Sequence, residues 1–268
     1  MKRKGFKEIL LLFSMLFALT GCSVSEATQH GMAVDTIQAE DVLLRVDFLN
    51  VGQADCALLS TNGHYMVIDG GNNGDADTIL SYLEGQGVEK LDAVVGTHPH
   101  EDHIGSLDAI INHFDVDAVY MPKIMHTSKT FEDVLDAVAN KGLKIKSPVP
   151  GDTIDFNGLE IEVLGPQREY KDFNNNSIVL KVNAGETAFL FTGDAEETAE
   201  KDILQAGYDL QADVLKVGHH GSSTSSSQAF LQAVQPKYAV ISVGVGNSYH
   251  HPEEEALQRL QSIGAEIY

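Results

Sequence analysis

The chain has 268 residues and a formal net charge of −21, because 39 acidic residues outnumber 18 basic ones. A surface this acidic repels polyanions at long range, which excludes a wide surface that grips nucleic acid through many Lys and Arg contacts. Only two cysteines and no tryptophan are present, which excludes a disulfide-stapled scaffold and choline-binding aromatic repeats.

Residues 1–22 have the layout of a secretory signal, in which four basic residues precede an apolar run at 9–19. The run is too short to span a bilayer as a permanent helix. It ends in Leu19-Thr20-Gly21-Cys22, which resembles the lipobox of bacterial lipoproteins, where the cysteine carries the lipid. An ordinary cleavable signal is the alternative, since Thr20 and Gly21 are small. The lipobox predicts a protein anchored through Cys22 on the extracytoplasmic face of the cell membrane.

The polar, aperiodic segment 23–41 is predicted to be a flexible linker between this anchor and one domain at 42–268. That domain is long enough to bury a large core without staples. With Cys22 acylated, Cys56 has no partner for an intramolecular disulfide, and we expect it to be a buried thiol.

Strand and helix patterns alternate along the domain. The first half predicts strands at 43–48, 56–60, 65–69 and 91–95, a hairpin turn at Asn62-Gly63, and helices around 79–83 and 104–111. The second half predicts strands at 118–121, 178–182, 188–191, 214–217 and 238–243, a hairpin at Asn157-Gly158, and helices at 131–141, 196–205, 228–234 and 253–263. Two similar halves of this kind predict an α/β fold in which two packed sheets carry helices outside.

The stretch THPHEDHIGS at 97–106 follows the predicted strand at 91–95. His98 and His100 can converge on one point, while Asp102 and His103, at the start of a helix, aim at a second point nearby. Pro99 restricts the backbone between the first pair. Imidazole and carboxylate suit Zn²⁺, Mn²⁺ or Fe²⁺. Ordinary polar loop residues are the alternative, but His-X-His-X-Asp-His rarely arises by accident, so the stretch predicts half of a two-metal site.

This signature resembles that of the metallo-β-lactamase-fold hydrolases, and several further stretches are similar to the hydrolase domain of ComEC-type competence proteins. They are FLNVGQADCALL (48–59), MVIDGG (66–71), NNNSIVLKV (174–182), FLFTGDAE (189–196), DVLKVGHHGSSTS (213–225), PKYAVISVG (236–244) and NSYHHP (247–252). The resemblance runs from about residue 46 almost to the end of the chain. It implies a single-domain αββα four-layer sandwich with two divalent metal ions, Zn²⁺ or Mn²⁺, at the edge between its halves.

The resemblance also implies roles for individual residues. The first metal would be held by His98 and His100, the second by Asp102 and His103, and Asp194 would bridge both ions. Either His219 or His220 would complete the second site. The sequence leaves that choice open; the working assignment takes His219 as the ligand and places His220 with Asp102 and Asp194 among the catalytic residues. Residues expected behind the site or against substrate are Asp69, Asn176, Ser177 and His251.

The chain departs from the family pattern between the signature loop and Asp194, where many relatives carry a third histidine for the first metal. No histidine occurs from 127 to 218, and Asn176 and Ser177 stand at about that place, where they offer only a neutral oxygen or a water. The first site should therefore bind Zn²⁺ more weakly, or favour Mn²⁺ with extra waters. Smaller departures are Asn50, Ala54 and His250. The sequence also stops at AEIY, where the family usually continues through another strand.

The leading functional hypothesis is a phosphodiesterase that acts on DNA outside the membrane, with a metal-bridged hydroxide as nucleophile and a separate DNA-uptake channel as partner. One alternative is a cell-surface phosphodiesterase acting on phosphocholine or teichoic acid. Another is a degenerate metal-binding partner of the channel. The serine-rich stretch at 221–228 has no charged neighbour that would activate a nucleophile, so we interpret it as a turn that caps the next helix, with a phosphate-binding nest as the alternative.

Overall fold

The computed structural model describes residues 43–268. The predicted signal segment, Cys22 and the predicted linker at 23–41 lie outside the described residues. Within the described residues, no helix has both the length and the apolarity needed to cross a membrane. Cys56 is a buried free thiol, as predicted.

The first sheet has the strand order β1-β2-β3-β5-β7-β8. Its first three strands are antiparallel and the rest are added in parallel. The predicted turn at Asn62-Gly63 joins β2 to β3, and both turn residues have positive φ, as a tight hairpin requires. The bounds of the strands are β1 Arg45–Phe48, β2 Ala57–Thr61, β3 His64–Ile68, β5 Ala93–Val95, β7 Val119–Tyr120 and β8 Ile145–Lys146.

The second sheet has the order β15-β14-β13-β12-β11-β10-β9. It is antiparallel from β9 to β12 and parallel from β12 to β15. Its bounds are β9 Thr153–Phe156, β10 Leu159–Gly165, β11 Val179–Ala184, β12 Thr187–Phe191, β13 Val214–Lys216, β14 Tyr238–Val240 and β15 Glu266–Ile267; a separate small sheet pairs β4 (Lys90–Leu91) with β6 (Asp115–Val116).

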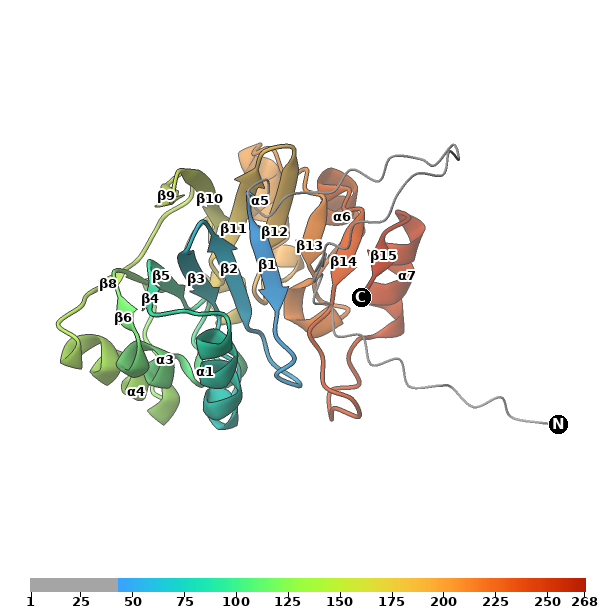
Figure 1. Ribbon diagram of the computed structural model, residues 1–268. Coiled ribbons are helices and arrows are strands. Elements are labelled where there is room, and N and C mark those ends of the chain that lie inside the picture. The colour runs from blue at the N-terminus through green and yellow to red at the C-terminus, as the bar shows by residue number, and fades with distance from the viewer. Residues whose placement is uncertain (1–42) are drawn as a thin grey trace, which may run out of the picture. The chain divides into compact units, whose positions relative to one another are not determined.

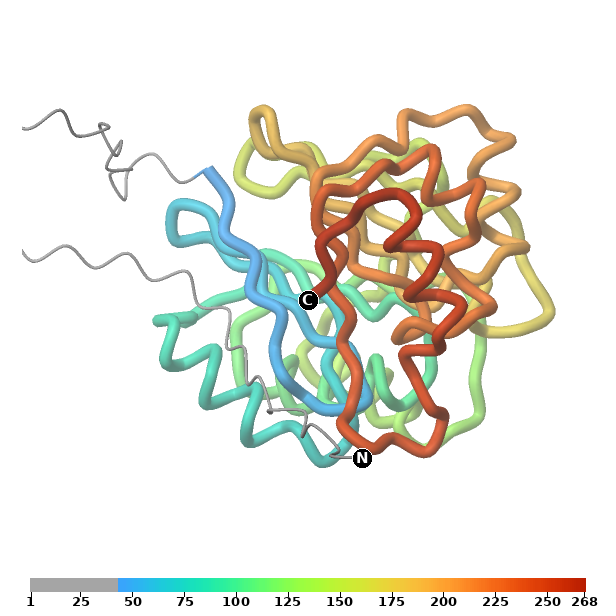
Figure 2. The backbone as a smooth tube through the Cα atoms, turned by 90° about the vertical axis from the view of Figure 1, so that its right-hand side faces the viewer, coloured from blue at the N-terminus to red at the C-terminus, as the bar shows by residue number. Residues whose placement is uncertain are grey.

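The two sheets face each other, and helices cover their outer faces (Figure 1). Apolar side chains such as Leu59, Met66, Leu180 and Phe191 form a shared core between the sheets. A second core lies under α1 (Ala76–Gly85), α3 (Leu107–His113) and α4 (Lys129–Asn140), and a third under α5 (Glu197–Ala206), α6 (Gln228–Val234) and α7 (Glu254–Ser262). Seen from the side, the two halves of the chain lie against each other (Figure 2). The predicted αββα sandwich is confirmed.

The predicted helix at 104–111 is instead two helices, α2 (Glu101–Ile104) and α3, with a break at Gly105 and Ser106. The backbone amides of both residues donate to the carbonyls of Gly71 and Gly70. A Cβ at Gly105 would lie 2.2 Å from the backbone carbonyl carbon of Asn72. The close approach of the 70–73 loop therefore breaks the helix and fixes α2, which carries two of the predicted metal-binding residues.

Candidate metal site

Three loops that leave the carboxyl ends of parallel strands form the site. The loop after β5 leads into α2 and carries the histidine signature, the loop after β12 carries Asp194, and the loop after β13 carries His219 and His220. Because β12 and β13 are parallel neighbours, their carboxyl ends lie at the same edge of the second sheet. Side chains from distant parts of the sequence therefore converge at this edge.

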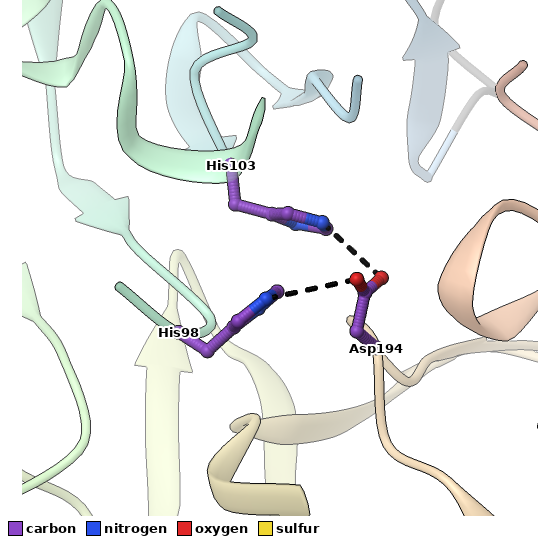
Figure 3. Close-up of side chains that lie close together, drawn as sticks. All are labelled: His98, His103 and Asp194. Atoms are coloured by element: carbon purple, nitrogen blue, oxygen red, sulfur yellow. Dashed lines mark ion pairs between the residues drawn. The ribbon is translucent and has the colours of Figure 1, made fainter. Parts of the chain in front are cut away.

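Asp194 lies at the centre of the cluster and is 2 % exposed. Its Oδ1 is 3.1 Å from His103 Nε2, and its Oδ2 is 3.6 Å from His98 Nε2 (Figure 3). His220 Nε2 lies 3.8 Å from Oδ1 and His219 Nε2 lies 3.8 Å from Oδ2. Each carboxylate oxygen thus faces a different set of imidazoles, which is the arrangement a bridging ligand needs.

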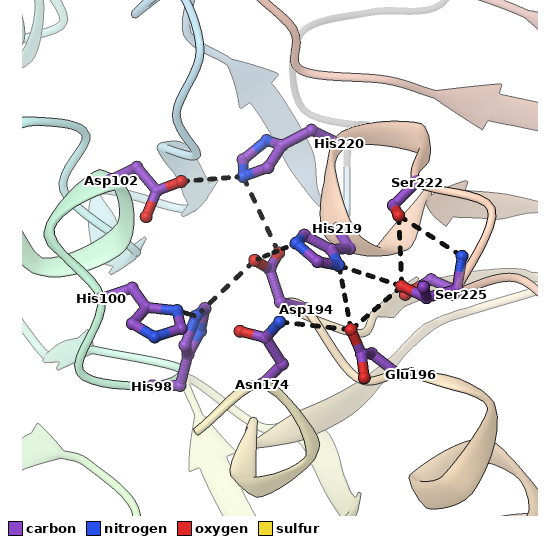
Figure 4. A network of polar contacts seen from close by, with 12 residues as sticks. His98, His100, Asp102, Asn174, Asp194, Glu196, His219, His220, Ser222 and Ser225 are labelled. Carbon is purple, nitrogen blue, oxygen red and sulfur yellow. Dashed lines mark hydrogen bonds and ion pairs between the residues drawn. The ribbon is translucent and has the colours of Figure 1, made fainter. Parts of the chain in front are cut away.

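His220, rather than His219, lies with Asp102 and His103. Its Nε2 is 3.3 Å from Asp102 Oδ2 (Figure 4), and these three residues offer ligand atoms within 4.8 Å of one another. His98, His103 and Asp194 form another such group. His219 and His220 both have positive φ, so the backbone makes a tight left-handed turn. That turn cannot be read from two adjacent identical letters, which is why the sequence left the pair unresolved.

His219 points to a polar network at the open side of the cluster (Figure 4). Its Nδ1 lies 3.3 Å from Glu196 Oε1 and 3.2 Å from Thr224 Oγ1, and its side chain is 24 % exposed. Asn174 Nδ2 and Thr224 Oγ1 donate to the same Glu196 oxygen. Glu196 was not predicted as a site residue, although its place two residues after Asp194 was a signal that could have indicated it.

His98 and His100 adjoin each other, with His98 Nε2 2.9 Å from His100 Nδ1. His98 is fully buried, whereas His100 is half-buried. The His100 ring packs edge-on against Phe173, at a centroid distance of 5.8 Å. This side of the cluster therefore reaches the surface through His100.

Asp69 lies behind His103. Its Oδ2 is 2.8 Å from His103 Nδ1, and Thr97 donates to the same carboxylate through both its backbone N–H and its hydroxyl. A carboxylate placed on the Nδ1 side fixes the tautomer and leaves Nε2 free to face Asp194.

A buried ion pair that was not predicted from the sequence lies below His220. Lys216 Nζ lies 2.8 Å from Asp55 Oδ2 and donates to the carbonyl of Val217 at 3.0 Å. Asp55 Oδ1 lies 3.4 Å from His220 Nδ1, which also contacts the carbonyl of Ser242 at 2.9 Å. The ion pair therefore supports the back of the cluster across both sheets.

The other three residues expected behind the site or against substrate make different kinds of contact. Ser177 Oγ accepts from the backbone N–H of Asp194 at 3.0 Å, so it holds that loop. The amide of Asn176 bonds to the backbone of Tyr170 and Asp172, so its polar atoms are occupied away from the histidines. The ring of His251 lies 5.6 Å from that of His219, and its buried Nδ1 has no partner within the described residues.

The serine-rich stretch caps a helix, as predicted. Ser227 Oγ accepts from the backbone N–H of Phe230 in the first turn of α6. Ser225 Oγ donates to the carbonyl of Ala195, which ties this loop to the one that carries Asp194. Ser225 and Ser227 thus bond to the backbone, whereas the hydroxyls of Ser222 and Ser223 donate to Glu253 Oε1.

The charge states at the cluster follow from burial and from the opposing carboxylates. Burial lowers the pKa of His98 well below its ordinary value, and it also lowers the pKa of His100. Burial acts to lower the pKa of His103 too, but the charges of Asp194 and Asp69 outweigh it and raise that pKa well above the ordinary value. Burial acts to raise the pKa of Asp102, but the hydrogen bond with His220 brings it down to about 2. The cluster thus holds ionised carboxylates beside neutral imidazoles at His98 and His100, whereas the surrounding carboxylates favour the protonated form of His103.

The residues present fit divalent cations. Four buried polar atoms of the cluster have no hydrogen-bond partner within the described residues: Asp55 Oδ1, His103 Nε2, Asp194 Oδ1 and His220 Nε2. Three of them face one another at 3.1 to 3.8 Å without hydrogen-bond geometry. Leaving such atoms unpaired costs about 1–3 kcal/mol each, a cost that a cation between them would remove. Nitrogen and carboxylate donors in this mixture suit Zn²⁺, Mn²⁺ or Fe²⁺.

Comparison with known protein families agrees with a metal site of this kind. The chain belongs to the metallo-beta-lactamase superfamily, whose family model matches residues 49–245. Members of this class are generally hydrolases, and the chain carries the residue groups that could bind their metal ions.

Curated relatives include competence proteins. The chain is 32 % identical over 235 residues to ComE operon protein 3 of Bacillus subtilis, covering 81 % of the chain and 30 % of that protein. It is 32 % identical over 221 residues to competence protein ComA of Neisseria gonorrhoeae, with the same coverage of each. The chain therefore spans less than a third of the length of these relatives.

Solved structures share the fold. The metallo-beta-lactamase fold protein YhfI of Bacillus subtilis has a TM-score of 0.58 at 11 % identity, covering 84 % of this chain and 95 % of that one. CmlA, a diiron β-hydroxylase from Streptomyces venezuelae, has a TM-score of 0.55 at 15 % identity, covering 81 % and 51 %. At these identities the likeness shows the fold alone.

Proposed function

We propose that this protein is a metal-dependent phosphodiesterase that hydrolyses DNA outside the membrane and serves competence. One observation carries the proposal: the two oxygens of the buried Asp194 face two separate sets of histidine nitrogens. The relation to proteins named for competence supports DNA as the substrate.

The geometry supports an assignment of the ligands. His98, His100 and Asp194 Oδ2 would hold the first ion. Asp102, His103, His220 and Asp194 Oδ1 would hold the second, which exchanges the working roles of His219 and His220. With two imidazoles and a shared carboxylate, the first position should favour Mn²⁺ over Zn²⁺. When bound, the two cations would offset the charge of a phosphodiester and lower the pKa of water enough to supply a nucleophile near neutral pH.

The protein's own residues would orient these ligands and the substrate. Asp69 and the carbonyl of Ser242 accept from the Nδ1 atoms of His103 and His220, which leaves both Nε2 lone pairs facing the centre. Glu196 fixes His219 in the same way, with His219 Nε2 on the open side of Asp194. A proton at that Nε2 would donate a hydrogen bond to a phosphoryl or leaving-group oxygen.

The proposed location rests on the N-terminal sequence. We propose that Cys22 anchors the protein on the extracytoplasmic face of the cell membrane and that a separate channel takes up the DNA. The net charge of −21 opposes a long contact with DNA, so a nuclease of this kind would engage only a few nucleotides next to its metals.

Activity and metal content test the proposal together. The full chain in detergent, supplied with Mn²⁺ or Zn²⁺, should cleave single-stranded DNA and bis(p-nitrophenyl) phosphate. Asp194→Asn should lose both the activity and about two equivalents of metal, measured by elemental analysis. Asp117→Asn, in an exposed ion pair with Lys90, is the matched control and should keep both. Cleavage of p-nitrophenyl phosphocholine alone would favour a surface phosphodiesterase, and metal binding without any activity would favour a degenerate partner of the channel.

A further inference from the structure

Two rings from different loops pack beside His100. His126 lies between β7 and α4, and Phe173 lies between β10 and the short helix at Asn174–Asn176. Their centroids are 4.6 Å apart with planes at 74°, and they lie 6.4 and 5.8 Å from the His100 ring. Both side chains are partly exposed. We call this pair the aromatic rim; it lies at the point where the candidate metal site reaches the surface.

The same two loops carry exposed lysines. Lys123 and Lys171 are exposed, and neither forms an ion pair within residues 43–268. Two neighbouring cations are paired, since Arg168 pairs with Asp202 and Lys129 pairs with Asp133. Asp172, the acid next to Lys171, accepts hydrogen bonds from the backbone N–H and the side-chain amide of Asn175. Lys123 and Lys171 stand three and two residues from the two rings along the chain, so each ring has an exposed cation in its own loop.

A planar ring system joined to an anionic backbone fits these features best. A nucleobase can stack on or edge against the rings, and the adjoining phosphate can contact the lysines. A choline group would gain from the rings but would be repelled by the ammonium groups. A polyol phosphate has no π face for the rings to contact. The combination therefore distinguishes a nucleotide from the other phosphodiesters considered.

We propose that the aromatic rim, with Lys123 and Lys171, binds the nucleotide next to the scissile phosphodiester. The inference rests on the proposed function, because it takes nucleic acid as the substrate of the candidate metal site. Since every base offers a π face, the rim would hold bases with little sequence preference. It would also compensate for the absence of a long basic groove, because a single stacked base replaces several phosphate contacts.

Binding of matched oligonucleotides tests the rim apart from cleavage. The full chain carrying Asp102→Asn, which stops turnover, is titrated by fluorescence anisotropy with oligothymidylate and with an abasic oligomer of equal length and charge. The rim should make the base-containing oligomer bind on the order of tenfold more tightly. Phe173→Leu and His126→Ala should each bring the ratio of the two dissociation constants close to one. Tyr238→Leu, at an exposed tyrosine on β14, is the control and should leave the ratio unchanged.

The lysines have their own readout. Lys123→Gln and Lys171→Gln should each reduce the slope of log affinity against log salt by roughly 0.7, while Lys144→Gln should not. The rim is overturned if the unaltered chain binds both oligomers equally. It is also overturned if the rim variants weaken both oligomers alike and lose metal, because the rings would then serve only to position His100. If the chain discriminates base from abasic but cleaves no DNA, the proposed function fails and the rim stands as a binding site.

Discussion

Replacing Lys216 with methionine removes the cation of the buried ion pair with Asp55 while keeping most of the side chain's length. The two side chains are only 5 % and 6 % exposed, so water cannot solvate the carboxylate that remains. Removing one partner of such a pair costs about 3–5 kcal/mol of folding free energy. The pair Lys237–Asp213 has a similar distance of 2.7 Å, but its lysine is 72 % exposed, so water solvates the charge that remains and Lys237→Met should cost far less.

Urea denaturation of the full chain and of the two lysine variants measures this difference. Adding Asp55→Asn to Lys216→Met should recover part of the loss, because no unpaired charge stays buried. Lys216→Met should also weaken metal binding, since Asp55 Oδ1 lies 3.4 Å from His220 Nδ1. If Lys216→Met costs no more than Lys237→Met, the buried pair does not support the site and the reasoning is wrong.

Three further predictions concern Gly105, Glu200 and the binding of metal. Gly105→Ala should destabilise the fold by more than about 2 kcal/mol in urea denaturation, because the new Cβ would lie 2.2 Å from the backbone of Asn72. A free energy of unfolding equal to that of the unaltered chain would contradict the close approach of the two loops. Burial raises the pKa of Glu200 to about 6. The stabilising contribution of this group to folding should therefore be present below pH 4.5 and be lost as the pH rises through 6, a change of about 2 kcal/mol. Glu200→Gln should abolish this change in pH-dependent denaturation. Mn²⁺ should raise the thermal midpoint of the full chain and a chelator should reverse this, because bound cations would satisfy the unpaired atoms of the cluster. Asp194→Asn is the control, and its midpoint should not change when Mn²⁺ is added. An equal rise in that variant would refute the assignment of the metal ligands.

Local patterns predicted most of the fold. Three features depend only on neighbours within a few residues, so a single sequence suffices to predict them. They are the turn at Asn62-Gly63, the strand before the histidine signature and the serine cap of α6. The break at Gly105 was not predictable, because it depends on a contact with a loop more than 30 residues earlier.

The candidate site shows the same division. Its histidines and Asp194 stand in recognisable stretches of the sequence. Asp55 and Lys216, in contrast, come into contact only when the two sheets pack together, and no local sequence feature of either residue predicts the other. The choice between His219 and His220 depends on two consecutive positive φ angles, which two adjacent identical residues do not reveal in a sequence.

The acidity of the chain and its proposed substrate are compatible because of where the charges lie. The exposed Asp117 and the partly buried Asp213 pair with exposed lysines, whereas Asp102 and Asp194 bring negative charge to the centre of the site. A phosphodiester could approach that centre only when cations offset the two carboxylates, so DNA binding should depend strongly on metal. With only two unpaired lysines at the aromatic rim, the dependence of binding on salt should be shallow, with a slope near roughly −1.4 for single strands. A steep slope would instead require a basic surface that residues 43–268 do not present, and the aromatic rim would then be a minor contributor to affinity.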